Sequence, residues 1–269
     1  MADTFRPNRV KELLKQGKVA VGLESHTTDP ALVEIMGWAG FDFVFIDTEH
    51  TPSDVGATVT AIRACDLTGM TPIVRVYENS PPLICKALDN GAQGVIVPHI
   101  STVGQAEAAV RAARFPPLGD RSACHSPRSL HYGLLPWKEY CQKANENTLV
   151  ILLIESVEGV RNMRDILKIR GVDVILFGIT DYSTSIGLSD EHYDNPKLYE
   201  TLKDIVKMSA EAGVSVMTIT INQSLLYDLS KLSYPRKIID AGVKMIALGS
   251  DVTVFRLVCQ GLIKIKELV

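Results

Sequence analysis

Charged side chains that could do chemistry stand at the ends of several short apolar runs of this 269-residue chain. Asp47 and His50 lie at the end of one run, Arg75 lies near the end of another, and Glu155 and Asp181 close two consecutive runs. A carboxylate or guanidinium is costly to bury unless it has a partner. Charges in these positions therefore suggest a functional site.

Glu155 and Asp181 together make a hard, anionic oxygen pair of the kind that Mg²⁺ and Mn²⁺ prefer. Two protein carboxylates leave coordination positions open for water and a bidentate substrate. Taken singly, either residue could instead pair with an arginine or cap the following helix. Their coincidence at neighbouring strand ends favours a metal site.

The remaining polar residues at these ends each have two interpretations. Arg75 could bind a substrate carboxylate or stabilise a developing enolate, or it could simply pair with Asp47. His50 could act as an acid or base because its pKa lies near physiological pH, or it could be a polar loop residue. Asp47 could orient either neighbour. His26, close behind Glu24, is interpreted as a polar rim residue, with substrate contact as the alternative.

Eight short apolar runs alternate along the chain with longer stretches of helical period. Most runs are continuously apolar and rich in Val and Ile, as is typical of parallel strands covered by helices on both faces. Eight strand–helix units predict a closed (β/α)₈ TIM barrel of the α/β class. A doubly wound open sheet is the alternative, but no G-x-G-x-x-G turn follows the first run. The runs span residues 19–23, 43–47, 72–76, 94–98, 149–155, 173–178, 214–219 and 244–249.

We expect residues 1–269 to form a single barrel domain, with the charged strand ends converging on one mouth. Asp89 does not fit this arrangement. It falls in the last turn of a predicted helix, where the helix dipole disfavours an anion. The helix would also carry it about 15 Å from the mouth of its own barrel. Any chemical role for Asp89 therefore requires the site of another subunit.

The connection over residues 115–148 is too long for an ordinary helix-to-strand loop. It emerges opposite the mouth, and we expect it to lie at a subunit interface. Its basic residues would face a neighbouring subunit, either reaching that subunit's site or forming a purely structural contact. These basic residues are Arg121, His125, Arg128 and His131. The structural alternative rests on the aromatic residues Tyr132, Trp137 and Tyr140.

Composition excludes several classes of protein. With 28 Lys+Arg against 31 Asp+Glu, the chain has no basic excess for binding nucleic acid. Five scattered cysteines without a C-x-x-C pair argue against a disulfide framework. The charged amino terminus and the lack of an apolar run of 18 residues predict a cytoplasmic protein without a membrane partner.

Several segments resemble the HpcH/HpaI aldolases, class II metal-dependent pyruvate aldolases related to the citrate lyase β-subunit superfamily. The resemblance covers residues from about 10 to 260 and keeps the order and spacing of the motifs. The segments are FDFVFIDTEHTPSD, PIVRVYENSPPLICKALDNGAQGVIVPHI, ARFPPLGDRS, LLIESVEGVRNMRDIL and VDVILFGITDYSTSIG.

The resemblance implies a barrel with a swapped final helix, assembled as a hexameric homo-oligomer, a trimer of dimers. The implied reaction is cleavage of a 4-hydroxy-2-oxo acid to pyruvate and an aldehyde, and the reverse addition, with Mg²⁺, Mn²⁺ or Co²⁺. It also implies a role for each matching residue: Glu155 and Asp181 hold the ion, Arg75 stabilises the enolate, His50 is the acid/base residue, Asp89 raises its basicity, and Gly178 and Thr180 bind substrate.

Departures from the family pattern keep other activities open. The family often has Gln two residues before the metal-binding Glu, where this chain has Leu153, and the segment Gly178-Ile179-Thr180-Asp181 replaces Gly-Pro-Ala-Asp. One alternative is an acyl-CoA lyase of the malyl-CoA or citryl-CoA type. The sequence contains no phosphate-binding motif that would support this alternative. The other is a pyruvate-like ligand binder that has lost turnover. Retention of Arg75, His50 and both carboxylates weighs against that binder.

Overall fold

The computed structural model describes residues 5–189, 191–220 and 233–268. Eight parallel strands form a closed barrel in the order β1 to β8, with β8 pairing β1. The predicted (β/α)₈ barrel is therefore confirmed, and each predicted run overlaps one strand. The strands are β1 (Ala20–Ser25), β2 (Phe43–Asp47), β3 (Thr71–Arg75), β4 (Gly94–Val97), β5 (Leu149–Ile154), β6 (Val174–Phe177), β7 (Ser215–Ile219) and β8 (Met245–Ser250).

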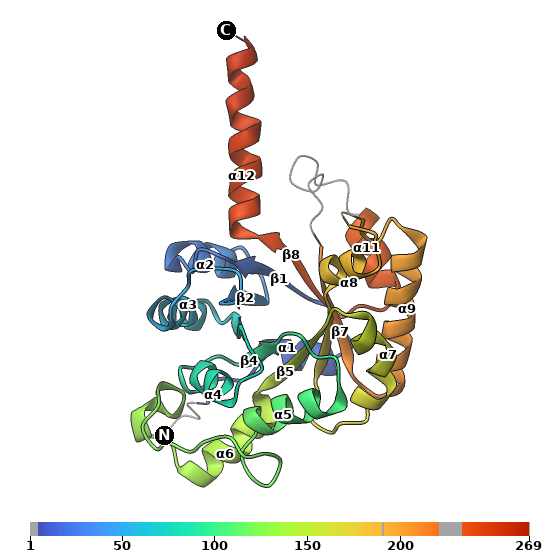
Figure 1. The fold of residues 1–269 in the computed structure, drawn as a ribbon. Coiled ribbons are helices and arrows are strands. Elements are labelled where there is room, and N and C mark those ends of the chain that lie inside the picture. The colour runs from blue at the N-terminus through green and yellow to red at the C-terminus, as the bar shows by residue number, and fades with distance from the viewer. Residues whose placement is uncertain (1–4, 190, 221–232, 269) are drawn as a thin grey trace.

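The helices of the described residues are α1 (Arg9–Lys15), α2 (Pro30–Trp38), α3 (Val55–Thr68), α4 (Pro81–Asp89), α5 (Val103–Ala113), α6 (Trp137–Asn147), α7 (Val157–Ile166), α8 (Ile179–Ser185), α9 (Pro196–Glu211), α11 (Ser233–Asp240) and α12 (Asp251–Leu262), with 3₁₀ helices η1 (Arg128–Gly133) and η2 (Ile263–Leu268). Helices α2 to α9 and α11 lie around the strands in Figure 1, whereas α1 lies at one end of the barrel and α12 projects from it. Among the described residues, no helix combines the length and apolar character that crossing a membrane requires.

The strands are apolar on both faces because each face packs against a different core. One face fills the barrel interior, where Phe45, Ile73 and Ile151 are fully buried. The other face, represented by Val44 and Val150, packs beneath the surrounding helices. Side chains of a strand alternate between its faces, so both sets must be apolar. This requirement explains the continuous apolar runs of the sequence.

The amino-terminal end of the barrel is closed by α1 and by the 115–148 connection. Val10 of α1 packs into the interior core, and the Asn8 side chain donates to the backbone oxygens of Gln93 and Asn147. Within the connection, η1 and α6 bury a cluster around Phe115 and Tyr140. The connection thus lies opposite the mouth, as predicted, while its place at a subunit interface stays a prediction.

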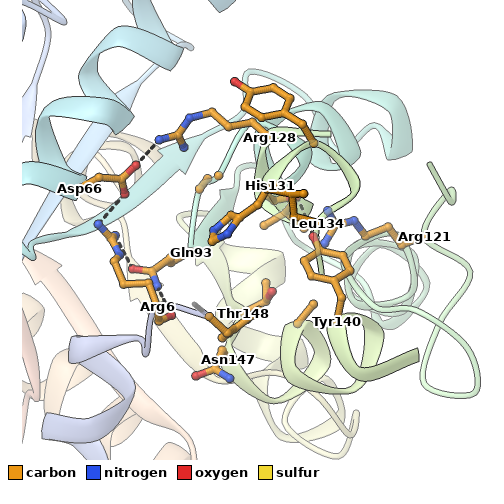
Figure 2. Close-up of a pocket in the computed structure, with 17 residues that line it drawn as sticks. Arg6, Asp66, Gln93, Arg121, Arg128, His131, Leu134, Tyr140, Asn147 and Thr148 are labelled. Atoms are coloured by element: carbon orange, nitrogen blue, oxygen red, sulfur yellow. Dashed lines mark hydrogen bonds and ion pairs between the residues drawn. The ribbon is translucent and has the colours of Figure 1, made fainter. Parts of the chain in front are cut away.

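A cavity of about 470 Å³ lies at this same end, between the start of the chain, α4, η1 and α6. Figure 2 shows Asp66 on its wall, joined to both Arg6 and Arg128, with His131 pointing into the space. Functional residues of barrel enzymes gather at the carboxyl ends, whereas the amino-terminal face contributes to stability. We therefore assign this cavity to the scaffold.

The last helix has a different relation to the barrel. Figure 1 shows α12 leaving the end of β8 and pointing away from the body of the molecule. Apolar side chains are exposed along it and along η2, and the most exposed are Phe255 and Leu262, at 68% and 70%. The others are Val252, Val258, Ile263 and Ile265.

Candidate active site

The inward face of the barrel changes from apolar to charged at the carboxyl ends of the strands. Along β2, Phe43 and Phe45 point into the interior core, and Asp47 takes the next inward position. The same alternation places further buried charges on the inward face. They are Glu24 on β1, Arg75 on β3 and Glu155 directly after β5. The predicted convergence on one mouth is thus found for Asp47, Arg75 and Glu155.

Arg75 is held by carboxylates on three sides. Its Nε donates to Asp47 Oδ1 at 2.8 Å and lies 3.2 Å from Glu49 Oε2. Its Nη2 lies 3.5 Å from Glu24 Oε1. The ion pair with Asp47, the alternative we weighed for Arg75, is therefore present. Among the described residues Nη1 makes no hydrogen bond, so this part of the guanidinium can still serve a ligand.

The two partners set each other's protonation. Burial alone would lower the pKa of Arg75, but the hydrogen bond to Asp47 and the nearby carboxylates outweigh it and raise this pKa. Burial alone would raise the pKa of Asp47, but the hydrogen bond and charge of Arg75 outweigh it and lower this pKa. Asp47 also accepts from the backbone N–H of Glu49 and of His50. It therefore fixes both the arginine and the turn after β2.

Glu155 lies at the end of β5, with 9% of its surface exposed. Burial raises its pKa to about 7, and the charge of Asp181 contributes in the same direction, while the backbone N–H and charge of His99 oppose the rise. A carboxylate that is both desolvated and close to a second carboxylate is poised for a cation. The charge of Asp181 is one of the causes that raise the pKa of Glu155, and the sharing of one ion by the two carboxylates stays a prediction.

Gly178, the residue before α8, leaves the space that Glu155 occupies. A Cβ added at Gly178 would lie 2.7 Å from Glu155 Cβ and 2.9 Å from Leu153 Cδ1. A side chain here would displace the carboxylate. Leu153 is itself inward-facing below Glu155, so the floor of the site is apolar at this point. Oxygen ligands, a raised pKa and a glycine cradle together fit a divalent ion.

His99 is a residue of this site that our sequence reasoning missed. Its Nδ1 lies 2.9 Å from Glu155 Oε1 and its Nε2 lies 3.0 Å from Glu49 Oε1. Its backbone N–H also donates to Glu155 at 3.0 Å. The residue adopts φ 58°, which is uncommon outside glycine. Its position just after the β4 run was the available signal, the same one that selected His50.

His50 is placed at the mouth but is not held by Asp47 through its ring. Its side chain is 62% exposed, and Nε2 lies 3.8 Å from Glu49 Oε2. The contact with Asp47 is made by the His50 backbone N–H at 3.3 Å. The imidazole is therefore free to meet a ligand at the surface of the mouth.

Hydrogen bonds connect the rim residues after β1 to the residue that follows β8. Asp251, the first residue of α12, accepts from the backbone N–H of His26 at 2.9 Å and of Thr27 at 3.1 Å. The His26 ring then lies with Nε2 3.2 Å from Glu24 Oε2. The Glu24 carboxylate close to the ring raises the pKa of His26, although His26 Nε2 makes no hydrogen bond among the described residues. His26 is a rim residue, as expected, and Asp251 is a positioning residue that the sequence reasoning did not select.

Asp89 has a partner in its own chain. Its Oδ1 accepts from Arg121 Nη2 at 2.5 Å, and Cys85 lies beside the same carboxylate. Arg121 is buried and its guanidinium stacks 4.6 Å from the centroid of the Phe115 ring. This ion pair explains an anion in the last turn of α4, which appeared unexplained in the sequence. It also corrects our placement of Arg121, which packs inside the chain.

The first turn of α8 lies beside the two carboxylates. Gly178, the residue that caps it, offers no side-chain hydrogen bond, and its own N–H is used by Ile154 O at 3.0 Å. Thr180 and Asp181 are the second and third residues of this helix and are exposed. Free backbone N–H groups at a helix start favour an anion. Gly178 thus contributes by leaving space for Glu155. The backbone N–H groups that could bind an anion belong to the residues that follow Gly178.

A parallel (β/α)₈ barrel with buried charges gathered at the carboxyl ends of its strands defines the class of barrel enzymes. Comparisons with known proteins identify which group within that class. The family model described as HpcH/HpaI aldolase/citrate lyase matches residues 21–257. The chain therefore belongs to this family, as the resemblance predicted, and is an enzyme of the aldolase/lyase type.

Individual relatives are similar over nearly their whole length. A 5-keto-4-deoxy-D-glucarate aldolase of Citrobacter koseri is 31% identical, with 97% of both chains covered. The structure of an HpcH/HpaI aldolase/citrate lyase family protein from Burkholderia cenocepacia matches with a TM-score of 0.85 and 28% identity, covering 96% of this chain and 99% of that one. The citrate synthase SbnG matches with a TM-score of 0.81 and 29% identity, covering 96% and 97%. The family thus includes more than one carbon–carbon chemistry.

Proposed function

We propose that this protein is a divalent-metal-dependent carbon–carbon lyase that cleaves a 4-hydroxy-2-oxo acid to pyruvate and an aldehyde, and catalyses the reverse addition. Two observations carry the proposal: Glu155 is buried at the end of β5 with a pKa raised by burial and by the charge of Asp181, and carboxylates hold Arg75 at the end of β3. Similarity to the 5-keto-4-deoxy-D-glucarate aldolases supports the reaction type.

Glu155 and Asp181 are the residues that would hold the ion, because they are hard-oxygen donors that follow neighbouring strands, and Gly178 leaves the space that Glu155 occupies. When bound, Mg²⁺, Mn²⁺ or Co²⁺ acts as a Lewis acid that polarises the 2-oxo group of the substrate. The substrate carboxylate would be received by the backbone N–H groups at the start of α8, around Thr180. These donors are fixed before substrate arrives, which is the condition for effective preorganisation.

Arg75 supplies positive charge beside the 2-oxo oxygen, where negative charge develops as the C3–C4 bond breaks. Asp47 keeps the guanidinium in place, because a side chain held at Nε cannot rotate away. During cleavage His50 removes the proton of the 4-hydroxyl, and a proton delivered from His50 or from water to C3 of the enolate completes pyruvate. During addition the same proton transfers run in reverse. The exposed ring of His50 at the edge of the mouth can exchange its proton with water.

We further propose a cytoplasmic homo-oligomer, a hexamer built as a trimer of dimers, in which Asp89 of one subunit acts on His50 of the next. The exposed apolar side chains of α12 support an assembly in which a second subunit covers this helix. Arg121 would then position Asp89 for that contact. Sedimentation and mixing experiments test this: inactive His50→Ala and Asp89→Ala chains should regain activity together after subunit exchange.

Pyruvate release from 4-hydroxy-2-oxo acids, followed in a coupled assay, tests the reaction. We expect turnover that disappears with EDTA, returns with Mn²⁺ or Mg²⁺, and is abolished in Glu155→Gln and Asp181→Asn. Turnover that survives complete chelation would reject the metal-dependent mechanism. No turnover with any aldehyde in the reverse direction would instead favour a ligand-binding protein.

A further inference from the structure

Two charged residues at the mouth, Glu24 and His26, have no role of their own in the mechanism just described. Glu24 is the inward residue of β1 at its carboxyl end, and 7% of it is exposed. His26 follows it on the rim. One ligand atom from each of Glu24, His26 and Asp47 lies within 4.8 Å of the others. Such a buried, preorganised group needs an explanation.

The position of Glu24 and His26 in the barrel places them near the half of the substrate that leaves as the aldehyde. In a closed ring of eight strands, β1 lies opposite β5 and β2 lies opposite β6. Glu155 follows β5 and Asp181 follows β6, so the two acidic residues proposed to hold the ion face the β1 edge across the mouth. A substrate held at its 1-carboxylate and 2-oxo ends on the β5–β6 side must extend its far end toward β1. That far end is the half that leaves as the aldehyde.

The group is rigid before any ligand arrives. Arg75 Nη2 lies 3.5 Å from Glu24 Oε1, and His26 Nε2 lies 3.2 Å from Glu24 Oε2 but makes no hydrogen bond among the described residues. The backbone that carries His26 is fixed by Asp251, which also accepts from the Thr27 hydroxyl at 2.6 Å. A recognition group needs such support to hold a contact in one geometry.

The charges select the chemistry of the group that can bind. Glu24 presents acceptor oxygens, and protonated His26 presents a ring N–H beside them. A hydroxyl both donates and accepts, so it can satisfy the two residues together. A carboxylate at the same place would meet three acidic residues, Glu24, Asp47 and Glu49. Arg75 and protonated His26 offset two of these three negative charges, so the site keeps a net negative charge. Like charges at close range repel in a partly buried site.

We propose that Glu24 and His26 form the recognition point for the aldehyde half of the substrate, and that they select an uncharged aldehyde with a hydroxyl on the carbon next to the carbonyl. This inference rests on the proposed function and names its substrate class. In this proposal the residues at the end of β1 discriminate between aldehydes. The residues at the ends of β3, β5 and β6 bind the pyruvate half, which all substrates share.

Three small aldehydes test the proposal in the direction of addition to pyruvate with Mn²⁺. Glycolaldehyde carries the hydroxyl, acetaldehyde lacks it, and glyoxylate carries a carboxylate instead. Each variant is judged by ratios of kcat/KM between aldehydes, relative to the same ratios for the wild type. Intrinsic reactivity, hydration of the aldehyde and any effect on Arg75 cancel in this comparison, because they are common to the two measurements.

In Glu24→Leu we expect the glycolaldehyde-to-acetaldehyde ratio to fall about 10- to 100-fold, as for loss of a hydrogen bond to a charged group. In Glu24→Gln, which keeps the shape of the buried side chain, we expect the glyoxylate-to-acetaldehyde ratio to rise several-fold. In His26→Gln that same ratio should fall, because a positive charge is removed. Glu78→Gln removes a matched but exposed carboxylate after β3 and should change neither ratio.

Exchange of the pyruvate C3 protons with D₂O, followed by NMR, separates this inference from the proposed function. The exchange needs the metal and Arg75 but no aldehyde. Exchange that persists while both ratios stay at wild-type values in Glu24→Leu and Glu24→Gln overturns the role of β1 and leaves the lyase intact. Wild-type protein that shows no metal-dependent exchange overturns the proposed function, and the inference with it.

Discussion

Glu155→Gln should make the metal-free protein more stable while abolishing its ability to bind the ion. Burial and Asp181 raise the pKa of Glu155 from 4.5 to about 7 in the folded chain. Each pKa unit corresponds to 1.36 kcal/mol, so the ionised carboxylate costs the folded state about 3 kcal/mol. A glutamine keeps the oxygen that accepts from the His99 backbone N–H but carries no charge.

The sign of the pH dependence follows from the raised pKa. Below pH 4.5 the carboxyl is protonated in both the folded and the unfolded chain, so it imposes no penalty. Between pH 4.5 and about 7 the unfolded chain ionises first, and the penalty grows until it is complete above pH 7. Glu155→Gln should therefore match the wild type near pH 4.5 and exceed its melting temperature by about 6 °C at pH 8.

Thermal unfolding in EDTA at several pH values measures this difference, and the linear denaturant slope checks that the same amount of surface unfolds. Adding Mn²⁺ at 100 times its Kd should stabilise the wild type by about 2.7 kcal/mol and leave Glu155→Gln unchanged. Glu158→Gln is the matched control, because it removes an exposed carboxylate from the first turn of α7 and should give no stabilisation. A Glu155→Gln protein no more stable than the wild type at pH 8 would refute the reasoning.

Three further substitutions test other parts of the site. Gly178→Ala places a Cβ 2.7 Å from Glu155 Cβ, so Mn²⁺ affinity measured by calorimetry should fall at least about tenfold, and unchanged affinity would contradict the cradle. Arg75→Ala should lower the rate of pyruvate formation about 10²- to 10³-fold, and an unchanged kcat would remove Arg75 from the mechanism. Arg121→Met leaves Asp89 without its cation and should reduce the free energy of unfolding in urea by about 3 kcal/mol, whereas the double variant with Asp89→Leu should recover most of it.

The strands could be predicted from the sequence because the physical requirement on them is local. A strand buried on both faces must be apolar at every position, and this leaves a continuous run that can be read directly, as at 43–47 and 149–155. The charged residues Asp47, Arg75 and Glu155 were accessible for the same reason. Each interrupts or ends a run, and parallel strands bring such ends together.

Contacts between side chains from separate units could not be predicted in this way. The alternation of β1 carries Glu24 inward, but only the register of the barrel shows that Arg75 reaches it from two strands away. Arg121 lies 32 residues from Asp89, within a connection whose apolar residues follow no regular spacing. No local sequence pattern therefore predicted that the two side chains pair. We interpreted the anion in the last turn of α4 as a sign of a role in another subunit, and the pairing of Asp89 with Arg121 in its own chain was not predicted.

His99 shows a different limit of prediction from sequence. Its position directly after the β4 run could have marked it as a candidate site residue, but the backbone conformation that turns it toward Glu155 could not be predicted. His99 follows the β4 run just as His50 follows the β2 turn, yet the two rings end in different environments. A left-handed φ turns the backbone N–H of His99 and its ring toward the same Glu155 carboxylate, and this makes the histidine a neighbour of the proposed metal ligands. Both rings are mostly exposed, and the difference lies in their contacts: the His50 ring lies 3.8 Å from Glu49 Oε2, whereas the His99 ring lies 2.9 Å from Glu155 Oε1 and 3.0 Å from Glu49 Oε1. Backbone conformation after the strand, rather than residue type, therefore separates the histidine that supports the acidic pair from the one available for proton transfer.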